Sequence, residues 1–243
     1  MRLRRRVLRT ASSFIVCAGF GCTSQPTRTP PIAPREPGQA SAHPGALAVV
    51  PPADSRQSIR HGERLERILA SGWGWRNDKD DQIHVPLLDW KRWKRIRFWG
   101  VEHLTGFKYE DSHDVLTIAV TVALPEGAEA TAANCLSAFD SWARPQARRY
   151  DVELGPMRTR RTSWRGGRLL VKWVDGHVDL GFQRREFSAA WAAYPAYPRS
   201  CLVYAVSVLW EGERTLAQQL RDRFVEEGFE QMDALTNVRP FRH

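Results

Sequence analysis

The residues from Asp114 to Leu124 alternate in a way that suits a β-strand, and this pattern constrains the fold more than any other feature of the chain. One side of such a strand would carry five apolar side chains: Leu116, Ile118, Val120, Val122 and Leu124. Successive side chains of a strand point to opposite faces of a sheet. A sheet with an apolar face has to be covered, by helices or by a second sheet.

The same period of two predicts further strands, over 94–109, 150–154, 169–174, 177–182 and 201–210. Between two of them lies Asp175-Gly176, a pair that favours a tight hairpin turn because both positions need positive φ. A polar turn at 110–113 joins the first two strands. Apolar residues at helical spacing predict helices over 58–70, 130–144, 187–194 and 213–232.

These elements predict a single α+β domain, with a mostly antiparallel sheet of about six strands and helices packed on it. The order of the elements resembles that of the PsbP/Mog1-like sandwich. This resemblance implies a fold and no function.

The N-terminus has the layout of an export signal. An arginine-rich start through Arg9 precedes a short apolar run over 13–21, which is too short to span a bilayer, and Cys22 follows. The small residues before Cys22 resemble the lipobox of bacterial lipoproteins, although Gly19 stands where leucine is usual. That resemblance implies acylation of Cys22 and anchoring to a membrane. Residues 3–9 also resemble a twin-arginine export signal, and the alternative is a basic arm on a cytosolic protein.

A linker and a folded unit follow this segment. Residues 23–54 are rich in Pro and Thr, a composition that favours extended chain and does not build a core. We therefore expect a signal peptide over 1–22, a linker over 23–54 and an α+β domain over 55–243. The expected location is the cell envelope, by a lipid anchor facing the periplasm or in the outer membrane. The alternative is a secreted or periplasmic soluble protein.

Four cysteines limit the covalent chemistry of the chain. Processing of the signal would remove or acylate Cys17 and Cys22, which leaves Cys135 and Cys201. Two cysteines in an oxidising compartment most simply form one disulfide. The alternative is a nucleophilic cysteine with His177 as its base, for which no family-specific context is present.

Two basic clusters are the candidate binding surfaces. The chain carries a formal charge of +9, but five of the positive charges lie in residues 1–22 and the rest of the chain has +4. This mild excess argues against a nucleic-acid partner. The first cluster interleaves cations with aromatic residues over 89–99, and its cations are Lys91, Arg92, Lys94, Arg95 and Arg97. Such a stretch could stack on bases, sugars or lipid headgroups, or form a strand with one buried aromatic side.

The second cluster is predicted to be a loop over 158–168. It contains Arg158, Arg160, Arg161, Trp164, Arg165 and Arg168, with no acidic residue. Guanidinium groups can hold carboxylates or phosphates by paired hydrogen bonds, so the loop suits an acidic surface. The alternative is a solvated loop without a ligand.

The chain shows no catalytic signature, and we expect no cofactor and no metal. It has no G-x-S-x-G, no H-E-x-x-H, no phosphate-cradling glycine loop and no dinucleotide fingerprint. Asp111, Ser112, His113 and Asp114 include the residue types of a triad, but consecutive side chains in a turn diverge.

Three functions remain. The first is a non-catalytic envelope lipoprotein that binds an acidic protein partner, for example an immunity protein that neutralises a secreted toxin. The second is an enzyme that hydrolyses an envelope polymer, with a site assembled only by folding. The third is a binder of an anionic polymer or an acidic lipid surface, whose affinity would fall steeply with salt.

Overall fold

The computed structural model describes residues 55–77, 83–96, 104–147, 151–179 and 184–234. The expected signal peptide and linker lie outside these residues, and so do Cys22 and Arg97.

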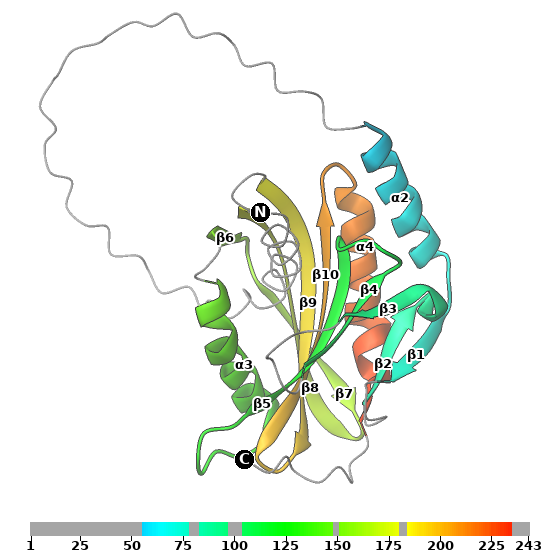
Figure 1. Cartoon of the computed structure of the whole chain (residues 1–243). Helices are drawn as coiled ribbons and strands as arrows, with labels where there is room; N and C mark the ends of the chain where they lie inside the picture. Colours follow the sequence, from blue (N-terminus) through cyan, green and yellow to red (C-terminus); the bar gives the residue numbers. More distant parts are fainter. Residues whose placement is uncertain (1–54, 78–82, 97–103, 148–150, 180–183, 235–243) are drawn as a thin grey trace, which may run out of the picture.

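An eight-stranded antiparallel sheet forms the centre of the fold (Figure 1). Its strands are β3 (Trp93–Ile96), β4 (Leu104–Tyr109), β5 (Val115–Ala123), β6 (Asp151–Leu154), β7 (Arg158–Trp164), β8 (Gly167–Asp179), β9 (Arg184–Tyr197) and β10 (Ser200–Trp210). Their order is β3-β4-β5-β10-β9-β8, and the long β8 pairs with β7 along its first half and with β6 along its second. Strand β3 and the β7 hairpin therefore lie at opposite ends of the strand order.

Helices and a second sheet cover the two faces. On one face lie α2 (Ser55–Leu69), α4 (Arg214–Arg223), and a three-stranded sheet of β1 (Trp73–Asn77), β2 (Ile83–Leu88) and β11 (Asp233–Ala234); α3 (Ala132–Ala147) packs on the other (Figure 1). Short helical turns complete the described chain: η2 (Trp90–Arg92), the π-helical η3 (Phe224–Gly228) and η4 (Phe229–Gln231). No helix among the described residues combines the length and the apolar character that crossing a bilayer requires.

The central sheet has a hydrophobic core on each face, and β10 contributes to both because its side chains point alternately to the two faces. Leu202, Tyr204, Val206, Val208 and Trp210 belong to the core under α2 and α4, and the intervening Cys201, Val203, Ala205 and Leu209 belong to the core under α3. In the core under α3, a disulfide joins Cys135 on α3 to Cys201 on β10, with the two Cα atoms 5.4 Å apart. This bond ties the helix to the centre of the sheet.

The expected fold class holds, but the number of strands is larger than six. Strands β1 and β2 were not predicted, and the segment 187–194, predicted as a helix, lies within β9. Ala190 and Ala192 face one core while Ala189 and Ala193 face the other. Because both faces of β9 are buried, its sequence lacks the alternation that identifies a strand, and pairing with β8 and β10 overrides the helical propensity of alanine.

The predicted turn at Asp175-Gly176 was wrong, since β8 continues through both residues. The paired positive φ values of a tight hairpin occur instead at Arg165 (48°) and Gly166 (76°), between β7 and β8. The segment predicted as a basic loop is thus a strand followed by this turn. Position 176 requires glycine because its neighbours leave no room for a side chain. A Cβ there would lie 2.4 Å from the carbonyl oxygen of Glu153 and 2.8 Å from the ring of Phe187.

Replacing Gly176 with alanine should therefore destabilise the protein. A methyl group at this position forces β6 or Phe187 to move, which we expect to lower the free energy of unfolding by about 2 kcal/mol. Urea denaturation measures this change. Gly72→Ala is the matched control, because a Cβ at Gly72 would have no neighbour within 4 Å. Equal stability of the two variants would contradict the assignment of Gly176 to a crowded strand.

Candidate functional site: a charged pocket beside helix α2

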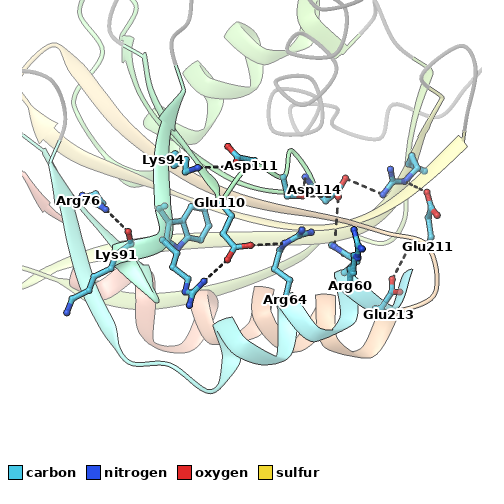
Figure 2. A pocket seen from close by; sticks show the side chains of 15 residues that line it. Arg60, Arg64, Arg76, Lys91, Lys94, Glu110, Asp111, Asp114, Glu211 and Glu213 are labelled. Carbon is cyan, nitrogen blue, oxygen red and sulfur yellow. Dashed lines mark hydrogen bonds and ion pairs between the residues drawn. The ribbon is translucent and has the colours of Figure 1, made fainter. Parts of the chain in front are cut away.

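A pocket of about 1000 Å³ lies between α2, η2, β3, the β4–β5 turn and the segment that links β10 to α4. We call it the basic pocket. Seven basic side chains line it: Arg60, Arg64, Arg76, Lys91, Arg92, Lys94 and Arg185. Five acidic side chains accompany them: Glu110, Asp111, Asp114, Glu211 and Glu213. Figure 2 shows Arg76 and Lys91 at one end and Glu211 and Glu213 at the other.

Glu110 organises the middle of the basic pocket. It follows β4 in a left-handed backbone conformation (φ 53°), and its carboxylate meets three arginines. Arg92 and Arg67 donate to Oε1 at 2.8 and 3.0 Å, and Nε of Arg64 lies 3.6 Å from Oε2. Arg92 thereby acquires a raised pKa, chiefly through this hydrogen bond. The three guanidinium groups come from α2 and η2, so Glu110 holds these two elements together at the pocket wall.

Backbone contacts fix the end of the pocket near η2. The guanidinium group of Arg76 on β1 donates to the carbonyl oxygens of Trp90 (2.9 Å) and Lys91 (2.8 Å). Tyr109 donates to the carboxylate of Asp89, and burial raises the pKa of this phenol far above its ordinary value. Nearby, the ammonium group of Lys94 pairs with Asp111 at 2.9 Å. At this end Arg76 is therefore bound to the backbone of η2, and Lys94 has an exposed acidic partner.

His61 lies at the opposite end and is 5% exposed. Its Nδ1 is 4.0 Å from a carboxylate oxygen of Asp114, and neither ring nitrogen has a hydrogen-bond partner among the described residues. Asp114 instead accepts a hydrogen bond from the hydroxyl of Ser112 (2.9 Å) and is approached by Arg185 (3.4 Å). Since the Ser112 hydroxyl donates to Asp114 and not to His61, these three side chains do not form the serine–histidine–aspartate relay of a hydrolase.

The stability of the protein should fall as the pH decreases below about 6.5, and His61 should contribute to that fall. Burial lowers the pKa of His61 from its ordinary value of 6.5, while the carboxylates of Asp114 and Glu213 oppose this shift without cancelling it. The unfolded chain then binds a proton at a pH where the folded chain does not, which favours unfolding as the pH decreases. Urea denaturation at several pH values between neutral and acidic measures this dependence. The free energy of unfolding of His61→Gln should decrease less with falling pH than that of the native protein. Parallel curves would contradict this prediction.

The structure brings only part of the first cluster into the basic pocket. Lys91, Arg92 and Lys94 line it, whereas Arg95 lines a neighbouring pocket. Trp93 is buried and donates to the carbonyl oxygen of Leu88 at 2.7 Å. Trp93 therefore faces the core while Lys94 and Arg95 are exposed. This agrees with the alternative for this stretch, a strand with one buried aromatic side.

The second cluster does not form one surface. In the antiparallel register, Arg161 pairs with Leu170 and Arg160 with Val171, so the arginines are divided between the two faces of the sheet. The inclusion of Trp164 was wrong: it is only 9% exposed, and its indole N–H donates to the carbonyl oxygen of Met232 (2.8 Å). The five arginines of the cluster are exposed: Arg158, Arg160, Arg161, Arg165 and Arg168. Arg165 forms an ion pair with Asp233.

Four basic residues of the pocket were not identified from the sequence: Arg60, Arg64, Arg76 and Arg185. They come from α2, β1 and β9, and no local pattern marks them, because folding alone makes them neighbours. Among the described residues, no group of three or more His, Cys, Asp or Glu side chains could hold a metal ion.

The fold and the pocket define an α+β protein with a charged pocket beside one edge of an antiparallel sheet. No protein family matches the chain, and no curated protein matches it. Solved structures that are similar include a mutant of the protein Mog1 (7% identity, covering 68% of this chain and 96% of that one) and the Ran-binding protein Mog1p of Saccharomyces cerevisiae (6%, 68% and 97%). Cyanobacterial PsbP of Synechocystis sp. PCC 6803 is also similar (13%, 68% and 93%). Each has a TM-score of 0.45, and we draw no functional conclusion from them.

Proposed function

We propose that this protein is a non-catalytic binding lipoprotein of the bacterial cell envelope, and that its basic pocket receives an acidic segment of a protein partner. The observation that carries the proposal is the charge of the pocket wall, where the described residues include seven Lys or Arg against five Asp or Glu. The export-signal pattern and the Pro-rich stretch before residue 55 support the location.

The excess positive charge lies at the end of the pocket near η2. Around His61, three basic residues (Arg60, Arg64 and Arg185) face three acidic ones (Asp114, Glu211 and Glu213). Toward η2, the remaining four basic residues have Glu110 and Asp111 as their acidic neighbours among the described lining residues. An acidic segment would therefore dock with its carboxylates toward Lys91 and Arg92, and the balanced end would set its direction. Complementary charge of this kind increases the association rate and selects the partner.

The distribution of charge favours a compact acidic segment over a long anionic polymer. A polymer is held along a continuous positive track. Strand β3 and the β7 hairpin lie at opposite ends of the strand order, and the second cluster divides between two faces, so the two clusters do not join in such a track.

Binding of a short fluorescent peptide of alternating Asp and Glu tests this function. Fluorescence anisotropy should show binding at low ionic strength that weakens toward about 0.15 M salt. The double variant Arg60→Gln, Lys91→Gln should bind about tenfold more weakly, because two exposed pocket cations each contribute part of a surface ion-pair energy.

The matched control is Arg160→Gln, Arg168→Gln, which neutralises two exposed arginines outside the basic pocket. It should bind like the native protein. An equal loss in both double variants would show that only net charge matters and would contradict the proposed site. Polyphosphate that binds more tightly than the peptide would favour the anionic-polymer function instead.

A further inference from the structure

A second pocket adjoins the basic pocket and has a different chemistry. It has a volume of about 670 Å³, and the described residues that line it are aromatic, basic or polar and include Trp75, Trp90, Arg76, Arg95 and Phe107. We call it the tryptophan pocket. Arg76 and Trp93 line both pockets, so the two are neighbours (compare the Arg76 end of Figure 2).

Exposure of large apolar side chains is concentrated here. Among the described residues, Ile59, Trp75 and Trp90 are the exposed large hydrophobic residues, and the two tryptophans are 49% and 37% exposed. Exposed tryptophan is costly to leave in water, and tryptophan and arginine are enriched among residues that carry most of the energy of a protein interface.

The rings are fixed in position. The indole N–H of Trp75 donates to the carbonyl oxygen of Gln231 at 3.3 Å. The Trp90 ring lies over Gly74, where an added Cβ would approach within 2.0 Å of it. Arg76 and Lys91 lie 5.5 and 5.7 Å from the centre of the Trp90 ring. A ligand that binds here does not have to order these side chains, which lowers the entropic cost of binding.

We propose that the tryptophan pocket binds an aromatic side chain of the same acidic partner segment, flanked by carboxylates that reach Arg76, Lys91 and Arg95. This inference rests on the proposed function, because the basic pocket supplies the neighbouring contacts. An aromatic ring fits the apolar surface of Trp75 and Trp90, and the described charged residues of the lining, Arg76 and Arg95, are both cations that suit acidic flanking residues.

The shape and the fixed cations favour a peptide over an acidic lipid surface. Trp75 and Trp90 line a hollow, whereas binding to a flat bilayer needs rings that project from a convex surface. The guanidinium groups of Arg76 and Arg95 are already bound to backbone carbonyl oxygens, those of Trp90 and Lys91 for Arg76 and that of Asn77 for Arg95. These contacts hold the two guanidinium groups at the hollow, where their remaining N–H groups can meet carboxylates of a peptide that enters it.

Two labelled peptides of equal charge test the inference. Both consist of Asp and Glu around one central residue, which is tryptophan in the first peptide and alanine in the second. By fluorescence anisotropy the native protein should bind the tryptophan peptide about tenfold more tightly, the gain typical of one well-seated interface anchor. Trp75→Ala and Trp90→Ala should each remove most of this preference, while the affinity for the alanine peptide stays the same.

Ile59→Ala is the matched control, since Ile59 is exposed and lines neither pocket; it should keep the preference. Urea denaturation of each variant shows that it is folded. If both peptides bind the native protein equally and with salt dependence, the inference fails and the proposed function stands. If neither binds, the proposed function fails and the inference fails with it. A preference for the tryptophan peptide that survives in both tryptophan variants would also overturn the inference. So would variants that bind both peptides like the native protein but lose binding to phosphatidylglycerol vesicles.

Discussion

Reduction of the Cys135–Cys201 disulfide should lower the free energy of unfolding by about 4 kcal/mol, the value that chain entropy gives for a closed loop of this size. The two cysteines are 66 residues apart in sequence, and both are fully buried. In the unfolded chain the bond keeps the two cysteines together and so limits the number of conformations. Reduction increases the conformational entropy of the unfolded chain, which favours unfolding. Urea denaturation with and without dithiothreitol, followed by tryptophan fluorescence, measures the difference.

The double variant Cys135→Ala, Cys201→Ala is the control for this experiment. It should be about as unstable as the reduced native protein, and dithiothreitol should not change its stability further. A native protein whose two thiols become titratable while its unfolding curve stays the same would contradict the prediction.

Removing the negative charge of Asp175 should destabilise the protein by about 3 kcal/mol, because it leaves a buried arginine without its partner on the sheet. Arg221 on α4 is 3% exposed and donates to Asp175 on β8. Asp175 also accepts hydrogen bonds from Ser188 (2.6 Å) and Gln218 (2.8 Å). It thus joins α4 to two strands. Asp222, which bonds to Arg221 at 2.8 Å, keeps the loss near the low end for a broken buried pair.

A pair of variants separates this effect from the loss of hydrogen bonds. Asp175→Asn keeps the shape of the side chain and removes its charge, whereas Arg221→Met removes the buried cation itself. Urea denaturation should show that Asp175→Asn combined with Arg221→Met is more stable than Asp175→Asn alone. If the stability losses of Asp175→Asn and Arg221→Met simply add in the double variant, the unpaired charge of Arg221 is not what destabilises Asp175→Asn.

The elements that the sequence predicted correctly are those whose periodicity matches their environment. Helix α2 has a single buried face, with Leu65 and Ile68 fully buried. In β10 the alternating set that begins at Leu202 and ends at Trp210 lies in one core, as its pattern predicts. In contrast, β9 is buried on both faces, and the spacing of its aromatic residues resembled that of a helix.

The turns and the binding site depended on longer-range contacts. Asp175-Gly176 has a sequence that favours a hairpin turn, but the pairing of β8 with β6 and β9 keeps it extended, and the turn forms at Arg165-Gly166. The first basic cluster indicated Lys91, Arg92 and Lys94 as site residues. The sequence contained no sign that Glu110 would meet arginines from two other elements.

The sequence by itself determined the fold class, because the alternation of apolar residues along β5 and β10 is a local property that any sheet containing them must satisfy. Only the tertiary structure decided where the charges meet. Arg60 and Arg185 stand 125 positions apart and share one pocket wall because α2 packs on the sheet that contains β9. Coulomb interactions depend on distance in space, and the order of residues along the chain does not encode that distance until the cores have formed.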